Sequence, residues 1–123
     1  MKSRITVLFM LIVLAVMLVG CGKDDKQIYK PGTYETEAQG YGGKMKVKTT
    51  FDQFKITQVL ITENGETEGI GSQAVEKLPG LIVEKNSTDV DSVSGATYSS
   101  NAIKDAVNSA INQAKEAFNN NQK

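Results

Sequence analysis

The clearest pattern in the chain is an alternation of lysine and hydrophobic residues that begins at residue 44. A period of two places the two kinds of side chain on opposite faces of a β-strand. We therefore predict a half-buried antiparallel strand over residues 44–51, with water on one side and a hydrophobic core on the other. The expected water-facing residues are Lys44, Lys46 and Lys48, and the expected core residues are Met45, Val47 and Phe51.

Weaker β-patterns flank this strand on both sides. Residues 33–39 are rich in Thr and Tyr, and residues 54–62 form another β-rich run, so each predicts a strand. Residues 40–43 and 52–53 supply turn signals between them, and the Asn-Gly pair in residues 63–66 ends the last strand. In this last strand we expect one face to hold Phe54, Ile56 and Leu60. Val59 and Ile61 are expected partly on the other face.

The C-terminal half of the chain changes to helical spacing. Apolar residues recur at intervals of three and four, which predicts an amphipathic helix from about Thr97 to Phe118. They are Ile103, Val107, Ala110, Ile111, Ala114 and Phe118. A shorter helical pattern covers residues 72–78, and Pro79-Gly80 is expected to interrupt it. Residues 81–83 fit either a further helical turn or a short strand. Strands followed by helices predict an α+β fold, with the helices packed on one face of a small antiparallel sheet.

The first residues of the chain have the layout of an export signal. Lys2 and Arg4 give a positive start, and the apolar run over residues 5–19 is shorter than the roughly 20 residues of a membrane-spanning helix. This run ends in Leu-Val-Gly-Cys, which resembles the bacterial lipobox, in which the cysteine is lipidated and becomes the new N-terminus. The lipidated residue would be Cys21. The alternative is an uncleaved membrane anchor with an incidental cysteine.

These features predict the organisation of the whole chain. We expect a lipoprotein signal peptide over residues 1–20, a lipidated polar tether over 21–32, one domain over 33–118 and a disordered polar tail over 119–123. A loop is expected over residues 87–93. The domain would lie on the outer face of the bacterial cytoplasmic membrane, held to the lipid bilayer through Cys21.

Composition excludes several kinds of chemistry. The chain has no His and a single Cys, so it cannot build a Ser-His-Asp or Cys-His nucleophile system, and zinc, haem and iron–sulfur clusters lose their usual ligands. Acidic and basic residues balance at 14 each, which gives no signature of nucleic-acid binding. We expect no metal site. Any redox chemistry must therefore come from an organic cofactor.

A run of small and polar residues opens the predicted C-terminal helix. Its sequence is Asp91-Ser92-Val93-Ser94-Gly95-Ala96-Thr97-Tyr98-Ser99-Ser100. The first N–H groups of a helix are unpaired and its dipole favours an anion, so a phosphate would fit there. The simpler interpretation is a helix cap, with Ser94 or Thr97 as the N-cap residue and Gly95 relieving a turn.

The pattern Asp91-x-x-Ser94-Gly95-Ala96-Thr97-x-Ser99 resembles the flavinylation motif of the FMN-binding domain family. Such domains occur in the sodium-pumping NADH:quinone oxidoreductase, in the Rnf complex and in many small exported lipoproteins. The resemblance runs from about Gly32 to about Ala114 and includes the glycine clusters at 40–43 and 69–71. In that family a separate flavin transferase joins FMN through its phosphate to the last Thr of the motif. The resemblance therefore implies a covalent phosphoester to Thr97, and it favours a helix for residues 81–83.

The resemblance also implies the surroundings of the cofactor. The residues around the phosphate would be Ser94, Gly95, Ala96, Ser99 and Ser100. Asp91 is negative and would repel a phosphate at close range, so we assign it to loop structure or to recognition by the transferase. Gly43, Gly69 and Gly71 would be neighbours of the flavin. The glycines at 40–43 are most simply explained by a hairpin connection.

The function implied by the resemblance is electron transfer rather than stand-alone catalysis. A lipid-anchored carrier would pass electrons from a membrane quinol or NADH dehydrogenase to an external acceptor or a partner reductase. A non-redox surface lipoprotein of the same fold is one alternative, and an accessory subunit of a quinone-linked redox complex is another.

Overall fold

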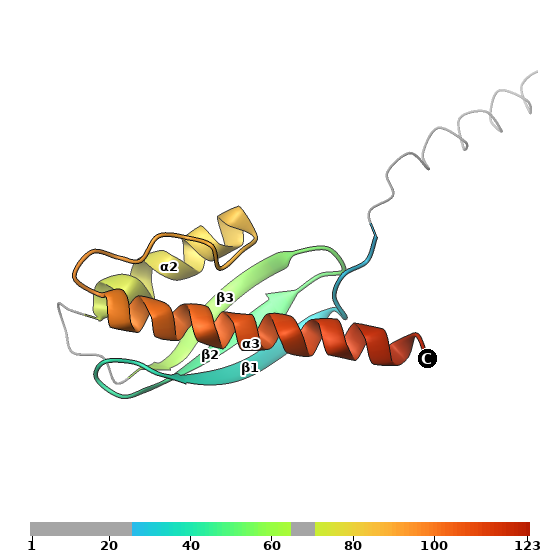
Figure 1. Cartoon of the computed structure of the whole chain (residues 1–123), viewed down its shortest axis with the longest axis horizontal. Coiled ribbons are helices and arrows are strands. Elements are labelled where there is room, and N and C mark those ends of the chain that lie inside the picture. The colour runs from blue at the N-terminus through green and yellow to red at the C-terminus, as the bar shows by residue number, and fades with distance from the viewer. Residues whose placement is uncertain (1–25, 65–70) are drawn as a thin grey trace, which may run out of the picture.

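Three antiparallel strands form a sheet in the order β1-β2-β3, and two helices cover one of its faces (Figure 1). The computed structural model describes residues 26–64 and 71–123. The elements are β1 (Gly32–Gln39), β2 (Lys44–Phe51), β3 (Ile56–Asn64), α2 (Ser72–Lys85) and α3 (Thr97–Asn121). This arrangement confirms the predicted α+β fold. The expected signal peptide, Cys21 and the first part of the tether lie outside the described residues, as does Gly69.

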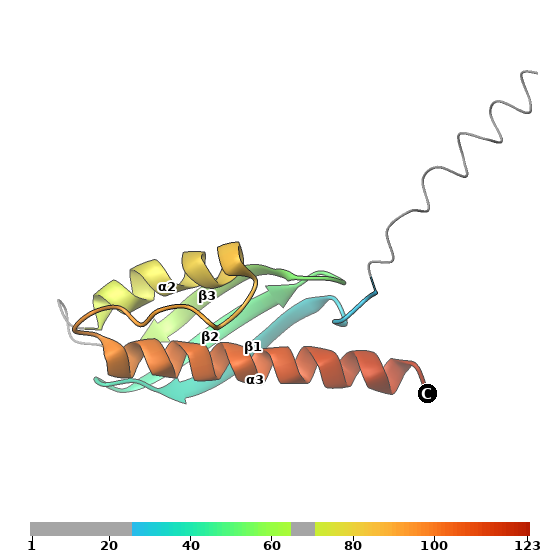
Figure 2. The ribbon, with the colours of Figure 1, turned by 45° about the horizontal axis from the view of Figure 1, so that its top comes forward.

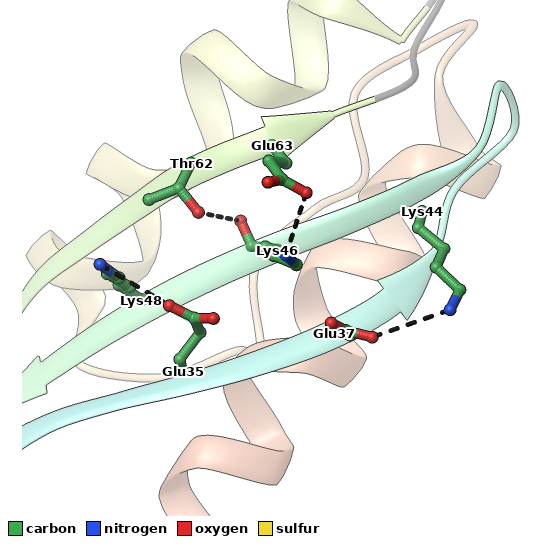
Figure 3. Close-up of polar contacts among 7 residues, drawn as sticks. All are labelled: Glu35, Glu37, Lys44, Lys46, Lys48, Thr62 and Glu63. Carbon is green, nitrogen blue, oxygen red and sulfur yellow. Dashed lines mark hydrogen bonds and ion pairs between the residues drawn. The ribbon is translucent and has the colours of Figure 1, made fainter.

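Strand β2 follows the predicted alternation. Met45, Val47 and Phe51 are buried in the core between sheet and helices. The three lysines emerge on the other face, where each lies near a glutamate of a neighbouring strand (Figure 3). The Nζ–Oε2 distances are 4.0 Å for Lys44–Glu37, 3.2 Å for Lys46–Glu63 and 3.6 Å for Lys48–Glu35. The hydrogen bond with Glu63 and its negative charge raise the pKa of the Lys46 ammonium group. The helices pack against the opposite face of the sheet, which is apolar.

The third strand differs from the prediction in which side chains face the core. Ile56 and Val59 are both buried, whereas Leu60 is 49% exposed. Phe54 is 40% exposed and precedes the strand, in the turn where Asp52 Oδ1 accepts its backbone N–H at 2.7 Å. The expected grouping of Phe54, Ile56 and Leu60 on one face is therefore wrong.

A β-bulge explains the change of face. Ile56 pairs with Phe51 of β2, but Gln58 pairs with the preceding Thr50, so Thr57 is an extra residue on β3. An inserted residue shifts the alternation by one position. As a result, Ile56 and Val59 both face the core although they lie three positions apart, whereas a regular strand would require two or four.

Helix α2 continues through Pro79 and Gly80, which corrects the predicted interruption. The helix buries Ala74, Leu78 and Ile82, which recur at every fourth position and face the sheet. Proline lacks an N–H group and so removes one hydrogen bond from the helix. Burial of the apolar stripe on both sides of the proline outweighs that loss, and residues 81–83 are helical, as expected.

Helix α3 starts at Thr97, as predicted, and runs to Asn121, beyond the expected end at Phe118. Its inner face is lined by small and apolar residues that are buried: Ala102, Ile103, Ala106, Val107, Ala110 and Ala114. The many alanines allow close approach to β1, where Thr36 Oγ1 donates a hydrogen bond of 2.7 Å to the carbonyl of Ala106. None of the described helices is long and apolar enough to span a membrane.

The two ends of α3 lie beside different parts of the sheet (Figure 2). Near the C-terminal end, the backbone N–H of Lys30 donates to the carbonyl of Ala114 at 3.1 Å, and that of Ile28 donates to Gln53 at 2.8 Å. The chain thus enters the domain there. The other end of α3 lies beside the connection between β1 and β2 (Figure 1).

Candidate functional site

Thr97 is the first residue of α3, and its side chain is exposed. The N-cap position is Ala96, with φ −129° and ψ 38°, and no side chain forms a capping hydrogen bond. The interpretation that Ser94 or Thr97 caps the helix is therefore wrong. The backbone N–H groups of Thr97, Tyr98 and Ser99 have no acceptor among residues 26–64 and 71–123. This helix end is open to an anion, since both the free N–H groups and the helix dipole favour negative charge.

The loop before Thr97 runs back along α3 (Figure 2), and side-chain hydrogen bonds join the loop to the helix. Thr88 Oγ1 donates to Asn108 Oδ1 at 2.7 Å, and Lys104 Nζ donates to Ser92 Oγ at 3.2 Å. These bonds position the loop without involving Thr97, so its hydroxyl stays free for chemistry.

Ser100 holds the turn that precedes the helix. Its buried hydroxyl donates to the carbonyl of Ala96 at 2.7 Å and accepts the N–H of Val93 at 3.0 Å. The N–H of Ala96 also donates to the carbonyl of Val93 at 2.9 Å. The structure thus gives Ser100 bonds within the turn, and its hydroxyl does not line the pocket described next.

Gly95 has a φ of +80°, a left-handed backbone conformation that residues other than glycine rarely adopt. A Cβ added there would meet no atom within 4 Å. The glycine is therefore required by the backbone bend and not by close packing. The bend brings the chain from the loop into the first turn of α3.

A pocket of about 390 Å³ opens at this end of the helix. It is lined by Tyr41, Gly95, Ala96, Thr97, Tyr98 and Ser99. Ser99 is only 1% exposed, and its Oγ has no hydrogen-bond partner among the described residues. Buried hydroxyl groups nearly always have a partner. Among the described residues the buried hydroxyl groups of Ser99 and Thr49 are the exceptions, and of these two only Ser99 lines the pocket.

The remaining expected site residues do not line the pocket. Asp91 and Ser94 are exposed in the loop. Gly43 closes the β1–β2 connection, where its carbonyl accepts the N–H of Gly40 at 2.8 Å. Gly71 is the buried N-cap residue of α2. The hairpin interpretation of residues 40–43 is confirmed.

Tyr41 and Tyr98 are pocket residues that the sequence analysis did not assign to the site. Their ring centroids lie 6.3 Å apart, and the ring planes are inclined by 75°. A signal was present, because Tyr41 stands between glycines of the flagged turn and Tyr98 directly follows Thr97. The contact between these two residues could not be predicted, because they lie in segments far apart in the chain.

Comparison with known proteins identifies the family of this chain. A family model described as "FMN-binding domain" matches residues 40–112, which include the β1–β2 connection, Thr97 and most of α3. The chain belongs to the FMN-binding domain family. Membership implies that FMN is the cofactor and that the role is flavin-based electron transfer.

Three relatives show the same segment within longer proteins. The FMN-binding domain is 33% identical over 86 residues to an NADH:acrylate oxidoreductase of Vibrio harveyi. This alignment covers 70% of this chain and 9% of that protein. The domain is 40% identical over 84 residues to an uncharacterized protein of Treponema pallidum, with 68% and 23% covered. A urocanate reductase of Eggerthella lenta is 34% identical over 74 residues, with 60% and 12% covered. The chain thus spans less than a quarter of each of these relatives.

The residues of the pocket fit FMN. Its phosphate matches the free N–H groups at the start of α3. Its flat ring matches a pocket with two tyrosines in the wall. The pocket at the start of α3 thus brings open backbone N–H groups and two aromatic rings to one end of the molecule.

Proposed function

We propose that this FMN-binding domain is a lipid-anchored electron carrier on the outer face of the bacterial cytoplasmic membrane, with FMN joined to Thr97 by a phosphoester. The observation that carries the proposal is the exposed, uncapped Thr97 at the edge of the pocket, beside the buried and unpartnered hydroxyl of Ser99. When bound, FMN supplies electron exchange singly or in pairs, which the side chains of this protein cannot supply.

A separate transferase makes the bond. The hydroxyl of Thr97 is a weak nucleophile, and the chain has no His to act as its base. In the transfer, Thr97 Oγ1 forms a bond to the phosphorus of the flavin donor, the bond between that phosphorus and the donor's leaving group breaks, and the hydroxyl proton passes to a base of the transferase. Asp91 and Ser94 are exposed in the loop beside Thr97, so they are accessible to such an enzyme.

The proposed path of electrons runs from a membrane quinol or NADH dehydrogenase to an external acceptor or a partner reductase. Support comes from the names of two relatives, an NADH:acrylate oxidoreductase and a urocanate reductase, each of which contains a segment like this domain in a much longer chain. Here the matching segment covers most of the domain itself. We propose that the remaining functions of such reductases belong to separate partner proteins.

The test is the intact mass of the protein after co-expression with a flavin transferase. The wild-type chain should gain the mass of one FMN and keep a yellow colour after denaturation. Thr97→Ala should be folded and colourless, because the acceptor oxygen is gone while no capping bond is lost. Thr97→Ser is the matched control and should retain attached flavin, since it keeps the hydroxyl.

Other outcomes would contradict the proposal. Covalent flavin in Thr97→Ala would place the attachment elsewhere. A colourless wild-type protein from a host with an active transferase would favour a non-redox surface lipoprotein of the same fold.

A further inference from the structure

The contact between Tyr41 and Tyr98 is unusual among the aromatic contacts of the domain. Tyr29 and Tyr34 each contact Phe51, which is buried in the core. Tyr41 and Tyr98 instead contact each other at the surface, with 65% and 61% of their area exposed. These are the largest exposed fractions among the exposed large hydrophobic side chains of the described residues. Core packing therefore does not explain why the two rings meet.

Both tyrosines are held in place by their backbones. Tyr98 lies in the first turn of α3, directly after Thr97. Tyr41 lies in the short connection that the hydrogen bond between Gly40 and Gly43 closes at 2.8 Å. The rings meet at 75°, so together they form a corner beside the pocket.

We propose that Tyr41 and Tyr98 form the binding surface for the isoalloxazine ring of FMN, an inference that rests on the proposed attachment at Thr97. Flat aromatic systems stack on the face of one ring and meet the edge of another, and a corner of two tyrosines offers both contacts at once. Bases of nucleic acids stack on exposed aromatic side chains in the same way. Because more than half of each tyrosine is exposed, part of each ring remains available for contact with a third ring.

The positions of the two ends agree with a single bound molecule. The phosphate end lies at Thr97 and Ser99, and the aromatic corner begins at the next residue of the helix. The two tyrosines would thereby position the ring and shield one of its faces from solvent.

Two optical measurements on the flavinylated protein test this inference. A tyrosine in contact with a flavin quenches its fluorescence, whereas a phenylalanine does not, and a ring held in one orientation gives visible circular dichroism. Tyr98→Leu and Tyr41→Leu should raise emission per flavin several-fold and weaken the dichroism. Tyr98→Phe should also raise emission but keep the dichroism, because stacking remains. Phe54→Leu, at an exposed aromatic outside the pocket, is the matched control and should change neither signal.

The outcomes separate this inference from the function on which it rests. Flavinylated Tyr41→Leu and Tyr98→Leu with wild-type emission and dichroism would overturn the ring-binding role and leave the attachment at Thr97 intact. A wild-type chain that accepts no covalent flavin from an active transferase would overturn both. Equal thermal stability of the variants and the control shows that the optical changes do not come from unfolding.

Discussion

Ser99 and Ser100 are neighbours in the chain, yet their hydroxyl groups are in opposite situations. Both are buried. Ser100 donates one hydrogen bond and accepts another within the turn, whereas Ser99 has no partner in the described part of the chain. A buried polar group without a partner costs stability, so the hydroxyl of Ser99, like that of Thr49, contributes no hydrogen bond to the fold of the described residues.

This contrast predicts different effects of the two alanine substitutions on the unligated protein. Ser100→Ala should lower the free energy of unfolding by about 1–3 kcal/mol, because the part-buried N–H of Val93 loses its acceptor and the carbonyl of Ala96 loses its hydroxyl donor. Ser99→Ala should leave it unchanged or raise it, since no hydrogen bond is lost and an unpartnered buried hydroxyl is removed. Urea denaturation of the two variants measures both values. Equal losses would show that Ser99 has a bonding role in the fold.

At the scale of elements, α2 shows how packing overrides local preference. Pro79 and Gly80 are both poor helix formers, yet the helix runs through them from Ser72 to Lys85. Leu78 and Ile82 lie on either side of the pair and are fully buried. The sequence predicted a break there because propensity acts locally, whereas the stabilising contacts come from the sheet.

Two glycines in different elements give a matched pair of predictions. Gly80→Ala should raise the free energy of unfolding by about 1 kcal/mol, because the added methyl group meets no atom within 4 Å and alanine is the better helix former. Gly95→Ala should lower it by about 1–2 kcal/mol, because φ is +80° although space is free. Thermal melts of the two variants should shift in opposite directions. Shifts of the same sign would contradict the backbone assigned to one of them.

The limits of prediction from the sequence follow from the same distinction between local and distant effects. The alternation in β2 and the start of α3 at Thr97 were predictable, since each is a local pattern. The bulge at Thr57 was not, because it depends on pairing with β2. For the site, the motif around Thr97 was visible in the sequence. The partner Tyr41 was not, because only the folded chain brings residues 41 and 98 together.

At the scale of the whole molecule, the proposed anchor can be tested separately from the cofactor. Cys21→Ala should abolish lipidation and membrane retention, since it removes the acylated atom while leaving the described domain unchanged. Partition into the detergent phase and intact mass measure the two effects. Flavin attachment should persist if the protein is still exported. A variant with the same mass and partition as the wild type would refute the lipid anchor.

Helix α3 sets a fixed distance between the two ends of the domain. The chain enters beside Ala114, whereas the pocket lies at Thr97, and a helix rises about 1.5 Å per residue, so the two points are about 25 Å apart along its axis. With Cys21 in the bilayer, an upright domain would carry its flavin well above the lipid surface. In the proposed electron path, the domain would therefore need two orientations. In one the flavin would lie near the membrane to accept electrons, and in the other it would point away from the membrane to deliver them.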